Sequence, residues 1–219
     1  MTFLCGFRSK SPRKDAYVIA LFGQTGVGVS SLVNLIVGHP VATYSVDTKP
    51  CTLSVTDHDV SWDNKQFRLY EVPGFGGHFS DTDIIDSIQS LEEKVGIDLL
   101  VYCLRKKRET LMPENLKKIR AKMPAGIPIV AVVTELERYK GDMASWWTIP
   151  SEGGKVANGK TLEDMGMTFA DHACVTTLPP EDVAQNTTFR ERRSHSENVV
   201  KNLVAKHCGG SKRRPRTTN

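Results

Sequence analysis

Short runs of apolar residues alternate along the chain with segments whose apolar positions recur every three or four residues. The runs rich in β-branched and aromatic residues predict buried strands, and the periodic segments predict amphipathic helices. We expect strands at 16–22, 53–60, 67–72, 98–104, 127–134 and 172–178, and helices at 30–37, 83–95, 112–123 and 189–208. This alternation predicts an α/β fold with a mostly parallel sheet and helices on both faces.

A single domain is expected to take up most of the 219 residues, because a chain of this length can bury a sizeable core. The domain is placed at 16–208, after an N-terminal extension at 1–15 and before a basic, disordered tail at 209–219. The long segment between the last two strands predicts an insertion at about 138–170. Trp146 and Trp147 are expected to anchor a small helix there, because tryptophan has a large apolar area to bury.

The overall charge gives little functional information, since the formal net charge is +4 and charged residues make up an ordinary 25%. The local distribution of charge is more informative. Basic residues gather in the tail at 211–216, at 105–108, and at Arg190, Arg192 and Arg193 beside His195. Such clusters favour polyanions such as phosphates, nucleic acid or acidic membrane surfaces. For the tail, a solvated basic segment is the plainer interpretation.

The five cysteines show no metal-ligand spacing. Cys103 and Cys174 lie within expected strands, where a free cysteine behaves as a small apolar residue. Reduced thiols and an intracellular protein are therefore expected. No apolar run reaches the roughly 18 residues of a transmembrane helix, and the N-terminus has too short an apolar core for a signal peptide. The expected location is cytoplasmic.

The stretch "LFGQTGVGVSSLVNLIVG" at 21–38 joins an expected strand to an expected helix. Its spacing of Gly23, Gly28 and Ser30 fits the Walker A pattern of a phosphate-binding loop, or P-loop. Glycines let successive backbone N–H groups converge on a phosphate, and the helix N-terminus adds partial positive charge. The hydroxyl of Ser30 is expected to reach Mg²⁺. A turn that merely resembles a phosphate loop is the alternative, and the motifs further along make it less attractive.

Val29 stands where such a loop normally carries a lysine. That lysine neutralises the β- and γ-phosphates as charge shifts in the transition state, so its loss predicts weaker phosphate binding and slower hydrolysis. Lys49 and the cluster at 105–108 are candidate substitutes.

"LYEVPGFGG" at 69–77 follows an expected strand and is similar to the D-T-P-G segment of GTPases. Glu71 replaces the aspartate that holds the hydration shell of Mg²⁺, and Gly74 stands where a backbone N–H senses the γ-phosphate. Phe75 occupies the position of the water-orienting glutamine of Ras-like enzymes, so hydrolysis would need another device. His78 is a nearby candidate, and a solvated loop histidine is the plainer interpretation.

The segment at 47–53 lies where a first switch loop would be, and Thr52 or Thr48 is a candidate for the Mg²⁺-sensing hydroxyl. Threonines are also common at strand starts.

"VVTELE" at 132–137 ends an expected buried strand, where guanine-recognising T/N-K-x-D segments lie. Glu137 could accept hydrogen bonds from guanine N1 and N2, as aspartate does there. Glu135 replaces the usual basic residue, which weakens base stacking. Thr176 and Thr177, in "HACVTTL", stand at the last guanine-contacting loop.

Residues 16–178 resemble the TRAFAC-class GTPases, with the closest likeness to the septin-like and immune-associated (AIG-type) branch and to related fungal G-domain proteins. The resemblance rests on the phosphate loop, the "VVTELE" segment, the tryptophan-rich insertion and the "HAC" strand. It implies a Rossmann-like P-loop sheet that binds a guanine nucleotide with Mg²⁺, and a homodimer formed through the nucleotide face. The departures from the family pattern fall on functional positions: Val29, Glu71, Val72, Phe75 and Glu135.

Three functions follow from these patterns. The first is a Mg²⁺-dependent nucleotide phosphohydrolase, GTPase-like, with scope for an unusual preference such as di- or monophosphates or deoxynucleotides. The second is a catalytically dead pseudo-GTPase that works as an interaction module. The third is a P-loop fold repurposed for nucleic-acid binding or phosphodiester cleavage, supported by the basic clusters.

The expected site residues fall into three overlapping groups. The catalytic candidates are Glu71, His78 and Thr52. The metal ligands are Ser30, Glu71 and Thr52. The nucleotide-binding candidates are Gly23, Gln24, Thr25, Gly26, Val27, Gly28, Val29, Ser30, Ser31, Gly74, Thr134, Glu137 and Thr176.

Overall fold

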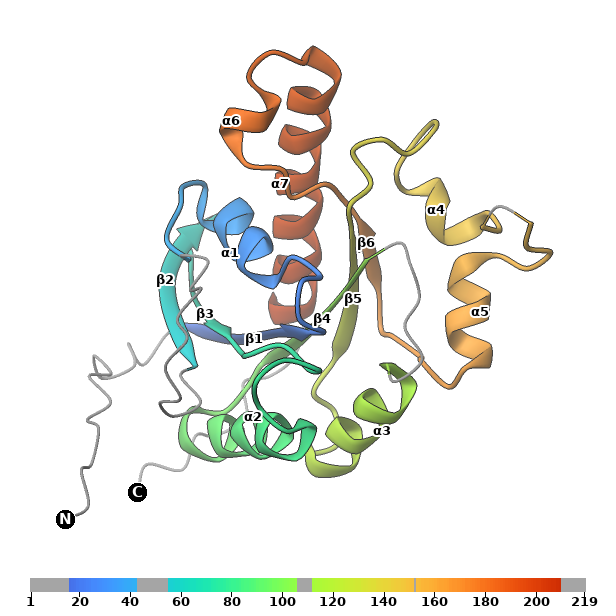
Figure 1. Cartoon of the computed structure of the whole chain (residues 1–219). Helices are drawn as coiled ribbons and strands as arrows, with labels where there is room; N and C mark the ends of the chain where they lie inside the picture. The colour runs from blue at the N-terminus through green and yellow to red at the C-terminus, as the bar shows by residue number, and fades with distance from the viewer. Residues whose placement is uncertain (1–15, 43–54, 106–111, 152, 210–219) are drawn as a thin grey trace.

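Six strands form one sheet in the order β2-β3-β1-β4-β5-β6 (Figure 1). The structure, a computed structural model, describes residues 16–42, 55–105, 112–151 and 153–209. The strands are β1 (Tyr17–Gly23), β2 (Thr56–Trp62), β3 (Lys65–Glu71), β4 (Leu99–Arg105), β5 (Ile129–Thr134) and β6 (His172–Cys174). Only the β2–β3 pair is antiparallel. The prediction of a mostly parallel sheet is thus confirmed.

The four longer helices cover the two faces of the sheet. Helices α1 (Val29–Val37) and α7 (Thr187–Gly209) pack on one face, and α2 (Asp81–Val95) and α3 (Met112–Lys122) pack on the other (Figure 1). Strands β1, β4 and β5 are buried along almost their whole length because helices cover them on both sides. Helices on both faces were expected, and the structure confirms them.

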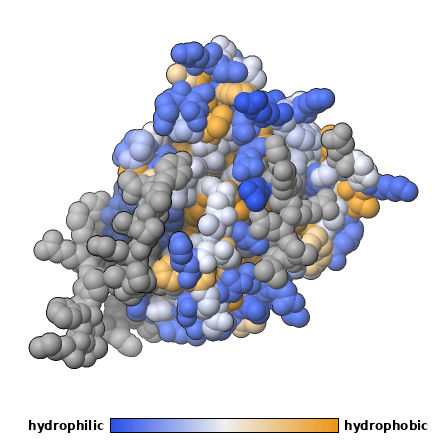
Figure 2. Space-filling model, in the orientation of Figure 1, coloured by the Kyte–Doolittle hydropathy of each residue, from blue (hydrophilic) through white to orange (hydrophobic). Residues whose placement is uncertain are grey.

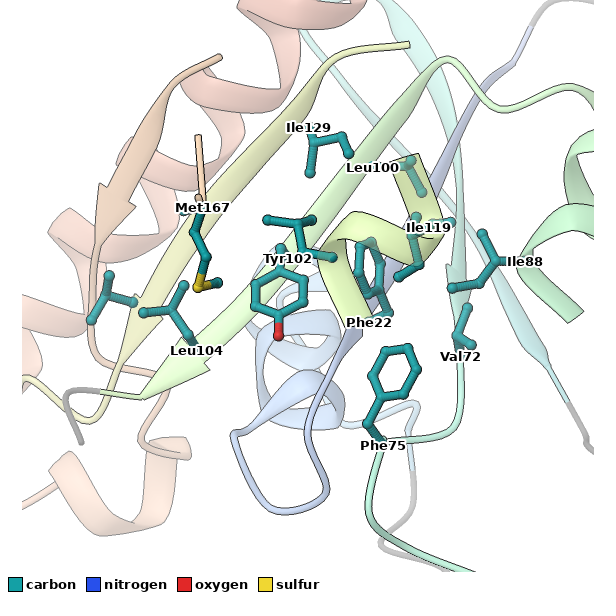
Figure 3. Packing of buried hydrophobic residues seen from close by; sticks show 14 of the residues in the cluster. Phe22, Val72, Phe75, Ile88, Leu100, Tyr102, Leu104, Ile119, Ile129 and Met167 are labelled. Atoms are coloured by element: carbon teal, nitrogen blue, oxygen red, sulfur yellow. The ribbon is translucent and has the colours of Figure 1, made fainter. Parts of the chain in front are cut away.

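One apolar cluster lies between the sheet and α2 and α3, and Figure 3 shows its centre. The rings of Phe22 and Tyr102 meet edge to face there, with centroids 5.1 Å apart. The second cluster joins the opposite face of the sheet to α1 and α7, and it includes Leu32 and Val204. A parallel sheet needs both clusters, since each of its faces is apolar.

Edge strand β2 differs from the central strands, because alternate residues along it are exposed. It reaches β3 through a tight turn in which Asp63 and Asn64 have φ of 49° and 58°. Aspartate and asparagine tolerate this left-handed conformation better than other side chains, and such turns match the twist of a hairpin. The strand expected at 53–60 is thus present as β2, at one edge of the sheet.

The insertion folds into the short helices α4 (Ser145–Thr148) and α5 (Asn158–Asp164). Trp146 is buried, and the ring of Trp147 stacks on His172 of β6 with centroids 4.0 Å apart. The two tryptophans therefore anchor this segment to the domain, as expected. The large apolar side chains exposed among the described residues are Ile149, Val156 and Met165, all in this segment. The face drawn in Figure 2 is mainly hydrophilic, with smaller hydrophobic areas between.

The last strand is shorter than predicted. A seven-residue strand was expected at 172–178, whereas β6 ends at Cys174. Val175 still bonds to β5, since its N–H donates to the carbonyl of Val133 at 2.8 Å. The next N–H, that of Thr176, donates to the hydroxyl of Ser196 on α7, 3.0 Å away. Helix α6 (Pro180–Val183) follows directly, and no periodic pattern predicted so short a helix.

The cysteines that the structure describes are buried and form no disulfide, and they are Cys103, Cys174 and Cys208. Burial raises the pKa of the Cys103 and Cys174 thiols to about 12, so these two side chains act as small apolar residues. Within the described part of the chain, no helix is long and apolar enough to cross a membrane. Gly209, expected to begin the tail at 209–219, is the last residue of α7. Several predictions fall outside the described residues: the extension at 1–15, the rest of the tail at 210–219, Thr48, Lys49, Thr52 and residues 106–108.

Candidate nucleotide-binding site

The phosphate loop connects β1 to α1, as predicted. Gly26 and Gly28 have φ of 82° and 92°, a left-handed conformation that only glycine adopts without strain. Gly28 is the N-cap of α1, no side chain caps this helix, and its first turn carries no acidic residue. The backbone N–H groups of that turn and the partial positive charge of the helix are therefore directed at the loop, which suits an anion.

Ser30 and Glu71 meet at the end of this loop. The hydroxyl of Ser30, in the first turn of α1, donates a hydrogen bond to the carboxylate of Glu71, the last residue of β3. Hydroxyl and carboxylate oxygens are hard donors of the kind Mg²⁺ prefers, so this pair fits the ion. Among the described residues no three His, Cys, Asp or Glu side chains group into a ready metal site. Bound Mg²⁺ would complete its shell with phosphate oxygens and water, as it commonly does.

The segment after β3 lies directly against the phosphate loop. The N–H of Phe75 donates to the carbonyl of Gly23, and the N–H of Thr25 donates to the carbonyl of Phe75, each over 2.9 Å. The hydroxyl of Thr25 donates to the carbonyl of Gly74 at 3.1 Å. A Cβ on Gly74 would lie only 2.7 Å from the Cα of Thr25. Position 74 thus needs glycine because two backbones approach each other closely.

Two side chains that the sequence predicted to stand in place of catalytic residues of GTPases lie in the apolar core. Val29 is 9% exposed and packs in the cluster beneath α1. Phe75 is 2% exposed and meets Phe22 edge to face, with centroids 6.5 Å apart (Figure 3). Neither side chain offers a group to a phosphate or a water. His78 is exposed in the loop before α2, and its catalytic role stays a prediction.

A pocket of about 350 Å³ opens beside the phosphate loop. It is walled by that loop, by α1 and by the chain that follows β5 and β6. The lining residues are Gly26, Val27, Gly28, Ser31, Glu135, Glu137, Thr177, Leu178 and Pro179. In open α/β sheets, ligands bind outside the carboxyl ends of the parallel strands, which is where these loops meet. The structure thus gathers distant segments of the sequence, including the predicted Glu137, around one cavity.

Thr134 and Thr176 were predicted to contact the nucleotide, and the structure places both behind the pocket wall. Each is fully buried. The hydroxyl of Thr134 donates to the carbonyl of Val27 at 2.7 Å, and that of Thr176 donates to Glu137 Oε2 at 3.2 Å. Each threonine therefore supports a residue that lines the pocket. Sequence position alone could not separate this indirect role from direct contact.

Some residues of the site were not predicted. Leu178 and Pro179 line the pocket. The sequence placed Glu135 in the guanine-recognising segment, but it did not predict its φ of 61° at the turn that leaves β5. Arg192 of α7 binds the loop that carries Glu137. No spacing or composition links a helix near the end of the chain to that loop, so only the fold shows these contacts.

Three features of this site are typical of a P-loop nucleotide-binding G domain. A glycine loop lies between a strand and a helix, a hydroxyl and a carboxylate meet at its end, and a pocket beside it is lined by the segments that follow β5 and β6. Residues 18–135 match the family of 50S ribosome-binding GTPases. Because this match covers more than half of the 219 residues, the chain belongs to that family.

Two relatives and one solved structure illustrate the likeness. The GTPase Der of Bifidobacterium longum (strain NCC 2705) is 29% identical over an alignment of 154 positions, which covers 67% of this chain and 32% of Der. The probable GTP-binding protein EngB of Wolbachia sp. subsp. Drosophila simulans (strain wRi) is 36% identical over 83 residues, 37% of this chain and 41% of EngB. The chain thus spans less than half of either relative.

The FeoB G-domain of Methanococcus jannaschii superposes with a TM-score of 0.51 at 15% identity, covering 89% of this chain and 99% of that one. At this identity the superposition supports the fold and nothing finer. A place in the septin-like and immune-associated branch, pairing through the nucleotide face and nucleic-acid binding all stay predictions.

Proposed function

We propose that this chain binds a guanine nucleotide together with Mg²⁺ and hydrolyses the terminal phosphoanhydride bond slowly. The contact between Ser30 and Glu71 carries the proposal, because it places a hydroxyl and a carboxylate at the end of a glycine loop that suits phosphate. The pocket beside the same loop supplies room for the rest of a nucleotide.

The base is assigned to guanine because of Glu137. Its carboxylate accepts from the hydroxyl of Thr176, which leaves acceptor capacity directed at the pocket that Glu137 lines. Guanine presents two neighbouring donors, N1–H and N2–H, that a carboxylate can accept together. Der is named a GTPase and EngB a probable GTP-binding protein, which supports the same base.

The phosphates would be bound by backbone N–H groups of the loop between Gly26 and Ser30. Ser30 and Glu71 would hold Mg²⁺, directly or through water, and Thr52 and His78 are further candidates. When bound, Mg²⁺ neutralises the charge of the phosphate oxygens and orients them. Hydrolysis is proposed to be slow because Val29 brings no positive charge to the transition state.

A second function has a specific observation in its favour. The side chains of Val29 and Phe75 are in the apolar core, at positions where GTPases carry the lysine and the water-orienting glutamine. A G domain with both groups missing could hold its nucleotide without turnover and act through partner proteins. An altered preference for nucleoside diphosphates is compatible with either function.

The two functions separate in one experiment on the full chain. GTP, GDP and ATP are titrated by calorimetry with Mg²⁺ and with EDTA, and phosphate release from GTP is followed over hours. Glu71→Gln and Ser30→Ala remove the proposed metal ligands, and Glu114→Gln, on the exposed surface of α3, is the matched control.

Mg²⁺-dependent binding of GTP that is weakened in both site variants but not in the control, with phosphate release, supports the hydrolase. The same binding without phosphate release supports the second function. Failure of the unchanged chain to bind GTP or GDP overturns both.

A further inference from the structure

We propose that Arg192 is a positioning residue for guanine recognition, because it holds the loop that carries Glu137 in the shape that base binding requires. The inference rests on the proposed function and adds to it. Arg192 lies on α7, a helix that contributes no residue to the pocket lining.

Arg192 binds four backbone carbonyls of a single loop. The two N–H groups of its Nη1 are shared among the carbonyls of Leu136 at 3.1 Å, Glu137 at 2.8 Å and Tyr139 at 2.8 Å. Its Nη2 donates to the carbonyl of Gly141 at 2.8 Å. Hydrogen bonds from a charged donor are stronger than those between neutral groups, and the planar fork fixes several acceptors at once. The guanidinium thus shapes the turn from 136 to 141.

The side chain of Glu137 is held from the same part of α7. The hydroxyl of Ser196 donates to the carbonyl of Arg192 at 2.7 Å and accepts from the N–H of Thr176 at 3.0 Å. The hydroxyl of Thr176 in turn donates to the carboxylate of Glu137. One turn of α7 therefore fixes both the backbone of Glu137, through Arg192, and its carboxylate, through Ser196 and Thr176.

A second lining segment of the pocket is tied to the next residue of the helix. Arg193 Nε donates to the carbonyl of Leu178 at 2.9 Å, and Leu178 lines the pocket. Consecutive arginines thus hold the two loops between which the base is proposed to lie. Helix α7 is a firm support for them, because Val200 and Val204 are fully buried against the sheet.

The loop needs such support because it leaves β5 in an unfavourable conformation. Glu135 has φ of 61°, which costs a non-glycine residue free energy and persists only where the surroundings enforce it. The four bonds from Arg192 begin at the carbonyl of the very next residue, Leu136. Without them we expect the turn to relax and the carboxylate of Glu137 to leave its place.

These contacts change the interpretation of the basic cluster on α7. Arg190, Arg192 and Arg193 each donate to a backbone carbonyl of their own domain. The sequence suggested that they attract a polyanion, whereas the structure uses their donors to shape the domain. Arg190 binds the carbonyl of Ala184, just before α7, so it provides a control of the same type on the same helix.

The test measures base discrimination rather than affinity alone. The full chain and the variants Arg192→Lys, Ser196→Ala, Glu137→Gln and Arg190→Lys are titrated with GDP and with inosine diphosphate, which lacks the exocyclic amino group of guanine. Circular dichroism and melting temperature report on folding. Lysine keeps the charge and the stem of Arg192 but cannot reach four carbonyls at once.

We expect the preference of the unchanged chain for GDP over inosine diphosphate to fall about tenfold in Arg192→Lys, because a mispositioned carboxylate loses its bond to the amino group. Ser196→Ala should lower the preference in the same direction. Arg190→Lys should keep it. Affinity for inosine diphosphate, which still presents N1–H to the carboxylate, should fall in Arg192→Lys, Ser196→Ala and Glu137→Gln by less than the affinity for GDP falls. In Glu137→Gln the preference should already be lost, so that adding Arg192→Lys lowers it no further.

A wild-type preference in both Arg192→Lys and Ser196→Ala overturns the inference alone, as does an equal loss of affinity for both nucleotides. If Arg192→Lys does not fold, the ratio of GDP affinity to inosine diphosphate affinity in Ser196→Ala tests the inference instead. Absence of GDP binding by the unchanged chain overturns the proposed function, and the role of Arg192 falls with it.

Discussion

The hydroxyl of Thr134 donates a hydrogen bond of 2.7 Å to the carbonyl of Val27. The two residues are 107 positions apart, and the bond joins the end of β5 to the phosphate loop. Both side chains are buried, so water cannot readily replace the donor. The shape of the loop therefore depends on a threonine that does not line the pocket.

Replacing Thr134 by valine keeps the size of the side chain and removes this bond. Leaving a buried carbonyl without its partner costs about 1–3 kcal/mol. We expect GDP affinity to fall roughly tenfold, since a distorted loop directs its N–H groups less well at phosphate. Calorimetry measures the change, and Thr134→Ser, which keeps the hydroxyl, should stay near the unchanged chain. Equal GDP affinities for the valine and serine variants would contradict this role.

Restoring the missing charge at position 29 should strengthen triphosphate binding. A lysine stem can follow the buried path of Val29 while its ammonium group extends toward the loop. Positioned charges of this kind contribute a few kcal/mol to phosphate binding and to the transition state, so we expect Val29→Lys to raise GTP affinity by about tenfold or more and to speed phosphate release.

Val29→Met is the matched control for this change, because it has similar length and no charge. An equal gain in the methionine variant would show that packing rather than charge is responsible. No gain in the lysine variant would mean that the ammonium group does not reach the phosphates.

Introducing glutamine at position 75 should not create a water-orienting group. Phe75 packs against Phe22 in the core, and an amide there would be buried without the partners it has in water. We expect Phe75→Gln to lower the free energy of unfolding by about 3 kcal/mol, as for other losses of a buried aromatic ring, without faster hydrolysis. Urea denaturation and phosphate release check the two parts. Faster phosphate release with unchanged stability would show that residue 75 faces the nucleotide.

Local sequence patterns were sufficient to predict most of the strands and helices of the fold. The central strands are predictable because they are apolar throughout, and the phosphate loop because its glycines stand between a strand and a helix. The pairing of Ser30 with Glu71 was also predictable, since two known motifs bring hydroxyl and carboxylate to one sheet edge.

The features of the fold and the site that the sequence did not predict depend on contacts between segments far apart in the sequence. Neither the burial of Phe75 nor the reach of Arg192 to the carbonyl of Glu137 follows from neighbouring residues. The end of β6 at Cys174 was also missed, and the bond just beyond it, from the N–H of Thr176 to Ser196 of α7, joins segments that no local signal connects.

Asp171 should make the free energy of unfolding of the domain depend on pH in the acidic range. Burial alone would raise the pKa of this carboxyl, but hydrogen bonds from Lys206, the N–H of His172 and His207 lower it to about 2. A carboxyl whose pKa is lower in the folded chain stabilises the fold above its ordinary pKa of about 3.9. That stabilisation is lost as the pH falls through about 2.

At neutral pH, Asp171→Asn should therefore lower the free energy of unfolding by about 1 kcal/mol, a modest value because Lys206 is largely exposed. The difference from the unchanged chain should narrow between pH 4 and pH 2, where the carboxyl loses its charge. Urea denaturation across this range measures it. Asp164→Asn, which removes an exposed ion pair with Lys160 on α5, is the control and should change little. Because Lys206 and His207 lie near the end of α7, a constant difference at every pH would show that this helix is held by packing and not by the charge of Asp171.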